Sequence, residues 1–373
     1  MKKLFLVGND LNYFFSHRLP VAIGAMQVGF EVHVCVPSST RVNELKSYGF
    51  VFHDIPMKRG LGFFADFRLL VYLYKLYKKE KPDVIHHVTI KPVLYGSLVC
   101  RVINSAKIVN SITGLGYVFT SNTFKAKVLR IIVSFFYSFL FRSRNMSIIF
   151  QNKDDVDVFI KKKFVKSKQV FLIRGSGVDT SIYKETSIPN VQDKNVLIVL
   201  PARMLWDKGI GEFVEAAKIL KKDGLQARFV LVGGVDYENP EFISEEQLTL
   251  WVNKRIVEWW GFRSDIYEIF AQSSIICLPS YREGLPKALI EGMSVGRPIV
   301  TTNVPGCREV VQNGVNGFLV PKQDSVILAE ALRKLICDRK LMLAFGRASR
   351  DMAVKFFDVK QVVEQTLRVY SLE

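Results

Sequence analysis

Short apolar runs alternate with longer amphipathic stretches along most of the chain. The runs are rich in Val, Ile and Leu and end in polar residues or glycine, which is typical of strands in a parallel sheet. The stretches between them, such as 19–28, carry apolar residues at helical spacing. This alternation predicts an α/β fold with helices on both faces of parallel sheets. The expected strands are 4–7, 31–37, 50–55, 84–88, 107–112, 196–200, 228–232, 257–261, 275–279, 298–302 and 318–320.

A polar stretch, 181–195, separates the two series of strands. It contains Pro189 and reads as a linker between domains. We therefore expect two doubly wound, Rossmann-like domains that face each other across a cleft. The expected domains are residues 1–185 and 186–355, and ligands of such sheets bind beyond the carboxyl ends of the strands.

Two stretches of the first half, 64–81 and 124–144, combine large apolar stripes with many Lys and Arg residues. Each could be a helix that faces the core and presents a solvated basic side, or a helix that lies in a membrane interface. The longest apolar stretch, 128–141, is interrupted by Arg130 and two serines. No segment reaches the roughly 20 apolar residues that a membrane-spanning helix needs.

Composition and charge limit the kinds of protein that this chain can be. The chain has 373 residues, of which 49% are apolar, so two domains with their own cores are expected and disorder is excluded. The formal charge is +17, but residues 1–185 hold 28 Lys and Arg against 12 Asp and Glu. Nearly all of the excess charge therefore belongs to the first half, which favours a polyanion or an anionic membrane as its partner.

Cysteine spacing and the N-terminal segment exclude other classes. The five cysteines are far apart and form no CxxC pair, so neither a zinc site nor a disulfide framework is indicated. The apolar run 4–7 is too short for a signal peptide. We expect a protein of the cytosol with reduced thiols.

The segment 278–292 is the strongest local signal for chemistry. An apolar strand ends in a loop, Gly284 permits close approach of the backbone to a ligand, and Pro286 suits the first position of a helix. The N-terminus of such a helix binds phosphate or diphosphate. Glu283 precedes the helix and Glu291 lies within it, so the two carboxylates can hold groups on either side of a bound diphosphate.

Two further loops follow predicted strands. Arg203 and Lys208 in ARMLWDKG are cations at the carboxyl end of strand 196–200, where they could clamp the same diphosphate or be ordinary surface cations. Gly233-Gly234 after strand 228–232 could bring the backbone close to a ligand, although a plain turn would use the same residues. The shared topology of the loops favours the clamp.

These motifs resemble family GT4, the retaining glycosyltransferases with the GT-B fold. Glu283 and Glu291 match its EX7E motif, and ARMLWDKG matches its segment with a conserved Arg and Lys. FVLVGG, GFRSDI and the whole of 276–320 fit the C-terminal pattern. In the first half SHRLP, GFEVHV, IKPVLYG, ITGLGYVF and IFQNKDDVDVFI resemble the subgroup of capsule, O-antigen and PglA-type N-acetylgalactosaminyl transferases.

The resemblance implies a role for each matching residue. Arg203 and Lys208 neutralise the nucleotide diphosphate, Glu291 binds the ribose and Glu283 contacts the donor sugar; these cations and Glu283 form the catalytic set. The other implied donor-binding residues are Gly284, Leu285, Pro286, Lys287, Gly233, Phe262 and Arg263. The implied residues of the first domain, facing donor and acceptor, are Asn9, Ser16, His17, Thr113 and Gly114.

Two positions depart from the family pattern. Thr113 stands where many members have a histidine that touches the donor sugar, and Ser176 stands where an asparagine is common. Because Thr113 replaces that histidine, no residue of this chain is assigned to the histidine's contact with the donor sugar.

The resemblance implies transfer of a hexose or N-acetylhexosamine from a UDP-sugar to a polyprenyl-diphosphate-linked saccharide, for a surface glycan or a glycoprotein glycan. No metal or other cofactor is expected, because placed cations and a helix N-terminus can stabilise the leaving diphosphate. The expected location is cytoplasmic, peripheral on the inner face of the cell membrane. The final stretch, 356–373, is expected to return to the first domain.

Other functions were weighed against this one. Asp155-Val156-Asp157 is a DxD string, but Asn152 and Asp155 suit a helix cap better than a metal site. His86-His87 ends a strand without a set of further ligands, so contact with substrate is the stronger alternative to a metal. A nucleotide-sugar epimerase of the same fold remains possible, and so does a basic nucleic-acid binder, although no recognition motif for nucleic acid is present.

Overall fold

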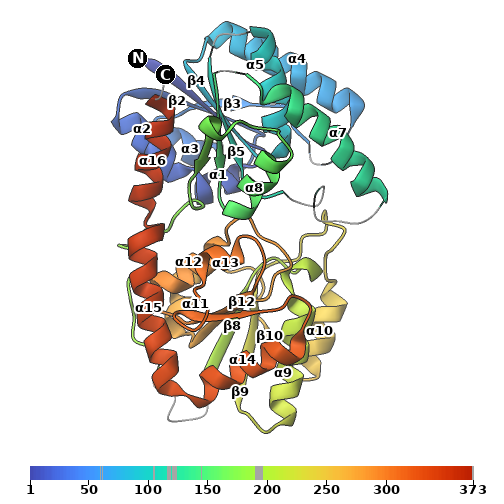
Figure 1. Ribbon diagram of the computed structural model, residues 1–373, viewed down its shortest axis with the longest axis vertical. Coiled ribbons are helices and arrows are strands. Elements are labelled where there is room, and N and C mark those ends of the chain that lie inside the picture. Colours follow the sequence, from blue (N-terminus) through green and yellow to red (C-terminus); the bar gives the residue numbers. More distant parts are fainter. Residues whose placement is uncertain are drawn as a thin grey trace. The chain divides into compact units, whose positions relative to one another are not determined.

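The chain folds into two compact units (Figure 1). A computed structural model describes residues 1–58, 60, 62–103, 106–115, 119, 124–143, 145–189 and 196–371, without the side chains of 125 and 126. Unit 1 comprises Met1–Ser176 together with Lys360–Glu373, and unit 2 comprises Gly177–Val359. The expected division at 185/186 lies within unit 2.

Unit 1 is built on a seven-stranded sheet with the order β3-β2-β1-β4-β5-β6-β7, in which every pairing is parallel. Its strands are β1 (Lys2–Val7), β2 (Phe30–Val36), β3 (Val51–Asp54), β4 (Val84–Val88), β5 (Lys107–Ile112), β6 (Met146–Phe150) and β7 (Val170–Leu172). Its helices are α1 (Leu11–His17), α2 (Leu19–Gln27), α3 (Val42–Ser47), α4 (Phe63–Glu80), the π-helix η1 (Pro92–Gly96), α5 (Ser97–Ile103), α7 (Phe124–Leu140), α8 (Lys153–Lys161), the 3₁₀-helix η2 (Ser167–Gln169) and α16 (Val359–Ser371).

Strands β4 and β5 have the bounds that the apolar runs predict, since both are almost completely buried between layers of helices. Strands β6 and β7 were not predicted. Strand β6 follows α7 after the polar segment 142–145, which the sequence analysis did not treat as a boundary. The predicted α/β architecture with parallel sheets is confirmed.

The C-terminal helix α16 belongs to unit 1 and is held there by a buried polar contact. Nδ1 of His86 in β4 lies 2.6 Å from the hydroxyl of Tyr370, and its Nε2 lies 2.7 Å from Oγ of Ser111. A Cβ on Gly24 of α2 would come within 2.4 Å of a side-chain methyl of Val363, so a larger residue there would force Val363 to move where α16 packs on α2.

Helices α4 and α7 each have one buried and one exposed apolar face. Helix α4 buries Leu69, Leu73, Leu76 and Tyr77 but exposes Phe63, Phe64 and Phe67. Helix α7 buries Val133, Tyr137 and Leu140 but exposes Val128, Ile131, Ile132, Phe135 and Phe139. Packing against the core therefore leaves a second apolar face on each helix. In the described part of the chain, no helix combines the length and the apolar character needed to cross a membrane.

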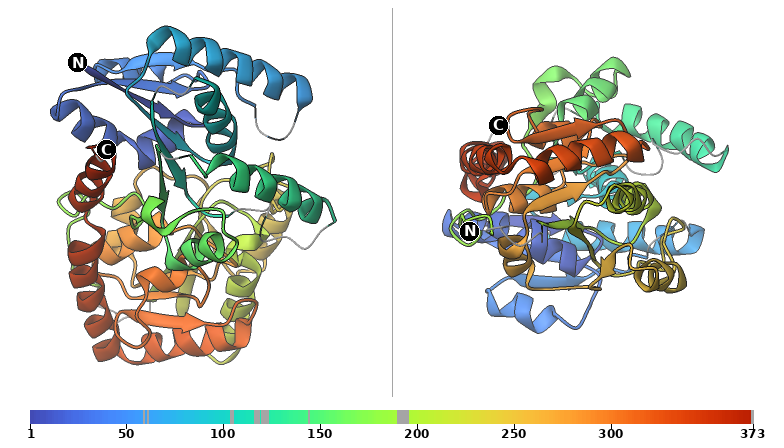
Figure 2. Two further views of the ribbon diagram at one scale, coloured as in Figure 1. Left: turned by 45° about the horizontal axis from the view of Figure 1, so that its top comes forward. Right: turned by 90° about the horizontal axis from the view of Figure 1, so that it is seen from below.

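Unit 2 has a six-stranded parallel sheet with the order β10-β9-β8-β11-β12-β13 and helices on both faces (Figure 2). Its strands are β8 (Val196–Pro201), β9 (Ala227–Val232), β10 (Glu258–Trp259), β11 (Ile275–Leu278), β12 (Ile299–Thr302) and β13 (Gly317–Val320). Its helices are the 3₁₀-helix η3 (Trp206–Lys208), α9 (Ile210–Lys222), α10 (Glu245–Asn253), α11 (Ile266–Gln272), α12 (Lys287–Ser294), α13 (Cys307–Val310), α14 (Ser325–Cys337) and α15 (Arg339–Phe357).

Candidate functional site

The order of strands in unit 2 creates a switch point between β8 and β11. The chain moves from β8 to β9 and β10 in one direction, and from β11 to β12 and β13 in the other. The loops that leave β8 and β11 therefore diverge, and the carboxyl ends of two such strands are where ligands bind in sheets of this kind. The candidate residues Arg203, Lys208 and Glu283 all lie on these two loops.

Lys208 and Glu283 form an ion pair across the switch point. Nζ of Lys208 lies 2.7 Å from Oε1 of Glu283, and the two side chains are only 16% and 15% exposed. Burial by itself favours a lower pKa for Lys208, but the charges of Glu283 and Asp207 outweigh it and hold the pKa above its ordinary value. Lys208 is therefore a cation throughout the neutral pH range, next to the loop that precedes α12.

Arg203 lies on the same loop as Lys208 but is bound differently. Its guanidinium pairs with the carboxylate of Asp236, which follows β9, and the Arg203 side chain is 56% exposed. An exposed ion pair of this kind contributes little stability and exchanges readily. Arg203 can therefore leave Asp236 for a phosphate, which a guanidinium binds through two parallel hydrogen bonds.

Helix α12 carries the second carboxylate of the sequence motif. Pro286 is the N-cap, one residue earlier than the first helical position that the sequence predicts, and the helix begins at Lys287. Oε1 of Glu291 lies 3.0 Å from Nζ of Lys287, one helical turn away, and the Glu291 side chain is 10% exposed. The N–H of Leu289 donates to the carbonyl of Pro286 at 3.1 Å, and the positive end of the helix dipole at this terminus favours an anion.

Tyr183 is a contact of Glu291 that the sequence did not identify. Burial raises the pKa of Tyr183, and so do the charge of Glu291 and a hydrogen bond to it. The tyrosine hydroxyl thus donates to the carboxylate and fixes its orientation. Tyr183 lies in the polar segment taken for a linker, where a lone tyrosine gives no signal of its own.

Gly233 supports the loop of Arg203 through its lack of a side chain. Its φ is +153°, and a Cβ there would lie 1.8 Å from the carbonyl oxygen of Ala202. The N–H of Gly233 donates to the carbonyl of Gly261 at 2.8 Å. Gly233 therefore lets the loops after β8, β9 and β10 pack against one another. The sequence suggested contact with a ligand as the reason for this glycine.

Phe262 and Arg263 follow β10 at the same edge of the sheet. The Phe262 side chain is 81% exposed. Arg263 pairs with Asp265, two residues along the chain, and is exposed as well. Both side chains are therefore accessible at the loop next to Gly233, and an exposed aromatic ring is suited to stacking on a planar base.

Gly306 is a second residue that the sequence analysis missed. It follows β12 with a φ of +81°, and a Cβ there would lie 2.6 Å from the carbonyl oxygen of Glu283 and 2.7 Å from that of Gly284. The backbone N–H of Glu283 also donates to the carbonyl of Pro305 at 3.2 Å. The loop after β12 thus forms the support on which Glu283 rests.

Replacing Gly306 with alanine is expected to displace the Glu283 loop and to lower the catalytic activity more than tenfold. An alanine with a positive φ costs roughly 1 kcal/mol in the free energy of unfolding. The cost at Gly306 exceeds this value, because two carbonyl groups must also move. Gly314→Ala is the matched control, since Gly314 has a φ of +77° and nothing within 4 Å of its Cβ position. Thermal unfolding and activity assays of the two variants check this; equal losses would contradict the support role.

The candidate residues of unit 1 lie at the carboxyl edge of its sheet. Asn9 comes shortly after β1, and Thr113 and Gly114 follow β5, two strands away in the sheet. Ser16 and His17 lie at the far end of α1, where Oγ of Ser16 is 2.6 Å from Nδ1 of His17. Asn9, Thr113 and Gly114 therefore lie on loops at this edge, and Ser16 and His17 lie one short helix further along the chain from Asn9.

Thr89 occupies the switch point of unit 1 and was not identified from sequence. It follows β4, the neighbour of β1, with a φ of +72°, which is strained for a β-branched residue. Its hydroxyl is buried and has no hydrogen-bond partner among the described residues. Strained residues with unsatisfied polar groups cluster at binding sites, so Thr89 joins the candidates for acceptor contact.

The DxD string and the His86-His87 pair have structural roles. Asn152 is the N-cap of α8, and its Oδ1 accepts a hydrogen bond from the N–H of Asp155 at 2.8 Å, which confirms the capping prediction. His86 and His87 are fully buried, so the alternative of substrate contact is wrong for these side chains. Among the described residues, no three His, Cys, Asp or Glu side chains are grouped so that they could hold a metal ion.

Comparison with known families gives two matches that together cover most of the chain. Residues 195–338 match the family described as "Glycosyl transferases group 1", and residues 3–152 match "Glycosyl transferase 4-like". The first match contains Arg203, Lys208, Glu283 and Glu291, and the second contains most of the sheet of unit 1 up to β6.

Among curated proteins, the chain is 29% identical over 367 residues to N,N'-diacetylbacillosaminyl-diphospho-undecaprenol alpha-1,3-N-acetylgalactosaminyltransferase of Campylobacter jejuni, with 95% of each chain covered. It is 26% identical over 322 residues to UDP-Gal:alpha-D-GlcNAc-diphosphoundecaprenol alpha-1,3-galactosyltransferase of Escherichia coli, covering 84% of this chain and 81% of the relative.

Among solved structures, HepE of Anabaena in complex with UDP and glucose superposes with a TM-score of 0.79 at 18% identity, with both chains fully covered. WaaG, a glycosyltransferase involved in lipopolysaccharide biosynthesis, gives a TM-score of 0.75 at 15% identity, again over both full chains. At these identities the likeness establishes the fold alone.

Proposed function

Because the chain belongs to the GT4-like glycosyltransferases and has their GT-B fold, we propose that it transfers a hexose or N-acetylhexosamine from a UDP-sugar to a polyprenyl-diphosphate-linked saccharide. The product serves the assembly of a surface glycan or a glycoprotein glycan. Two relatives whose names specify diphospho-undecaprenol-linked sugars as acceptors support this choice, and the one of them covered over 95% of its length is named for transfer of N-acetylgalactosamine. Unit 1 takes the acceptor and unit 2 the donor.

The observation that carries the proposal is the Lys208–Glu283 pair at the β8/β11 switch point, next to the N-terminus of α12. Departure of UDP places negative charge on the β-phosphate. Lys208, Arg203 and the first turn of α12 present positive charge toward that group, so they stabilise the charge as it develops. This arrangement uses no metal ion, and we propose that the reaction is independent of metal.

The proposed transfer step needs no separate protein base. The acceptor hydroxyl oxygen forms a bond to the anomeric carbon on the face from which the bond to the β-phosphate breaks. The departing phosphate oxygen takes the acceptor's proton. The configuration at the anomeric carbon is therefore retained, and Glu283, held by Lys208, orients the sugar hydroxyls.

The remaining contacts follow from position around the site. Glu291, oriented by Tyr183, accepts hydrogen bonds from the ribose hydroxyls. The backbone of 284–287 follows the sugar and the phosphates, while Phe262 and Arg263 lie near the base. Asn9, Ser16, His17, Thr113 and Gly114 remain proposed contacts of unit 1 with donor and acceptor.

A screen of UDP-sugars tests the function. The purified chain is incubated with a polyprenyl-diphosphate N-acetylhexosamine and each UDP-hexose or UDP-N-acetylhexosamine, and the lipid product is identified by mass. One donor is expected to add one sugar in the presence of a chelator. No addition from any of them would contradict the proposal, and conversion of the donor without acceptor would indicate an epimerase.

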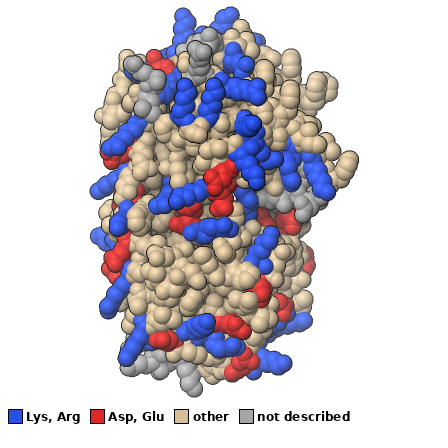
Figure 3. All heavy atoms as spheres, viewed as in Figure 1, with Lys and Arg blue, Asp and Glu red and all other residues tan. Residues whose placement is uncertain are grey.

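We further propose that unit 1 docks on an anionic membrane surface, because its substrate is a lipid. On the face shown in Figure 3, Lys and Arg side chains are spread over unit 1 with few Asp or Glu side chains among them. The exposed aromatic residues of α4 add apolar surface: Phe63, Phe64 and Phe67 are 82%, 86% and 62% exposed. Basic charge next to exposed phenylalanines is the composition of an interfacial helix.

Replacing Phe63, Phe64 and Phe67 with serine is expected to weaken binding to anionic vesicles at least tenfold. Each lost ring removes about 1 kcal/mol or more of the free energy gained when apolar surface moves from water into the membrane. Val28→Ser/Val102→Ser is the control, since these valines are 61% and 69% exposed on other elements of unit 1. Co-sedimentation with vesicles measures both. Unchanged binding of the phenylalanine variant would remove α4 from the docking surface.

A further inference from the structure

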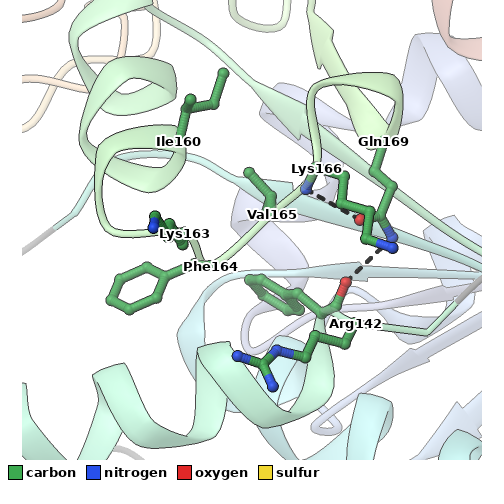
Figure 4. A pocket seen from close by; sticks show the side chains of 8 residues that line it. Arg142, Ile160, Lys163, Phe164, Val165, Lys166 and Gln169 are labelled. Atoms are coloured by element: carbon green, nitrogen blue, oxygen red, sulfur yellow. Dashed lines mark hydrogen bonds between the residues drawn. The ribbon is translucent and has the colours of Figure 1, made fainter.

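A pocket of about 350 Å³ lies in unit 1 at the amino ends of β6 and β7, the opposite edge of the sheet from Asn9 and Thr113. It is formed where α7 ends, where α8 ends and where η2 begins (Figure 4). The lining residues are Phe141, Arg142, Ile160, Lys163, Phe164, Val165, Lys166 and Gln169. Its volume is within the range of about 300–1,000 Å³ that small-molecule sites have.

The wall of the pocket is fixed by one buried side chain. Nε2 of Gln169 donates to the carbonyls of Phe141, Ser143 and Met146 at 3.1, 2.8 and 3.3 Å. Its Oε1 accepts from the N–H of Lys166 at 3.2 Å. Gln169 therefore ties the turn between α7 and β6 to the segment after α8, so that hydrogen bonds join the segments that line the pocket (Figure 4).

The lining is basic and apolar, with no carboxylate. Arg142, Lys163 and Lys166 are exposed, and none of them forms an ion pair within the described part of the chain. The C-terminal ends of α7 and α8 each contribute a partial charge of about −0.5, which three full positive charges outweigh. The pocket thus attracts an anion, and Ile160, which is 38% exposed, offers apolar contact beside it.

The exposed apolar face of α7 leads along the chain toward the pocket. Phe135 and Phe139 are 67% and 44% exposed, and Arg142 of the pocket lies two residues beyond Leu140, where the helix ends. The guanidinium of Arg101 lies 4.2 Å from the centre of the Phe139 ring. An apolar strip that ends in a cationic pocket matches a molecule with a hydrocarbon chain and a phosphate.

We propose that this pocket binds the phosphate of an anionic membrane lipid, whose acyl chain lies along Phe135 and Phe139. The inference rests on the proposed docking of unit 1 to a membrane and gives that docking a specific partner. It assigns the pocket no part in sugar transfer, since the candidate transfer residues lie at the carboxyl edges of the two sheets.

Vesicle binding of the full chain tests the proposal. The variant Arg142→Gln/Lys163→Gln/Lys166→Gln is expected to bind phosphatidylglycerol-containing vesicles about a hundredfold more weakly, because each basic side chain near an anionic surface contributes about fivefold. The matched control is Lys161→Gln/Lys162→Gln/Lys168→Gln, which removes the same charge from exposed positions outside the pocket. The control is expected to lose less than tenfold. Equal losses would overturn the proposal, because they would indicate a diffuse field instead of a pocket.

Two further arms separate the sources of the phosphate. Vesicles of phosphatidylcholine alone should bind the wild type and the pocket variant equally weakly. Inorganic phosphate, added at the same concentration as the anionic lipid in a calorimetric titration, should not displace the vesicles from the wild type. Displacement of the vesicles by inorganic phosphate would overturn the lipid assignment. Because these readouts require no catalysis, failure of the UDP-sugar screen leaves them interpretable, and loss of pocket binding leaves transfer to a detergent-solubilised acceptor intact.

Discussion

Replacing Lys208 with alanine is expected to lower kcat for sugar transfer by about 10²–10³-fold while the chain still folds. Removing one preorganised charge from a developing oxyanion has an effect of this size. Lys208 is suited to that role because it is largely buried and because Glu283 and Asp207 raise its pKa, so it meets the leaving phosphate as a cation. Steady-state kinetics with the identified UDP-sugar, together with circular dichroism, measures the effect.

Lys218→Ala provides the matched control for this prediction. Lys218 also forms an ion pair, with Glu215 at 2.6 Å, but it lies on the exposed surface of α9. Its loss is expected to change activity less than twofold, as exposed pairs contribute little. Full activity of Lys208→Ala would remove Lys208 from the catalytic set.

Replacing Glu283 with glutamine is expected to have the second largest effect, on both stability and activity. The change preserves shape but leaves Lys208 largely buried without its counter-charge. Loss of one partner of such a pair costs up to about 3 kcal/mol in the free energy of unfolding. A bound diphosphate restores a counter-charge, so UDP should raise the melting temperature of this variant more than that of the wild type.

Glu215→Gln is the corresponding control, since it breaks the exposed pair with Lys218. It is expected to shift the free energy of unfolding by less than about 0.5 kcal/mol and to respond to UDP as the wild type does. If UDP stabilises Glu283→Gln no more than the wild type, the diphosphate does not approach Lys208 in the proposed way.

The parts of this fold that could be predicted from sequence are those set by local patterns. Strands β4 and β5 are buried apolar runs, and the loops after β8 and β11 carry Arg203, Lys208 and Glu283 in order along the chain. The alternation of strands and helices predicted the parallel sheets, but the strand order that creates the switch point came from the structure. The predicted features depend on residues within a few positions of one another, so a single sequence contains them.

The pairings between distant loops could not be predicted. Gly306 supports Glu283 from the loop after β12, and Tyr183 reaches Glu291 from a segment taken for a linker. His86 meets Tyr370 across 284 positions of sequence. Each pairing depends on how neighbouring elements pack, and a lone glycine or tyrosine in a loop carries no periodic signal that could indicate it.

The environment of helices α4 and α7 could not be predicted from the sequence either. Their sequences were compatible with a core-facing helix or with an interfacial one, and the structure shows that each helix has a core face and an exposed apolar face. A single hydropathy profile averages the two faces. Only the positions buried against the sheet, such as Leu73 and Tyr137, separate the apolar residues that stabilise the fold from those left for a partner.

Calorimetric titration of UDP and uridine in the presence of a chelator tests the central claim most directly, namely that the β8/β11 site holds the diphosphate of the donor with protein cations. UDP is expected to bind the wild type at least about tenfold more tightly than uridine, because charge-assisted hydrogen bonds to the phosphates add about 1.5 kcal/mol or more. Lys208→Ala should remove most of that difference. Equal affinities of the wild type for UDP and uridine would contradict the account.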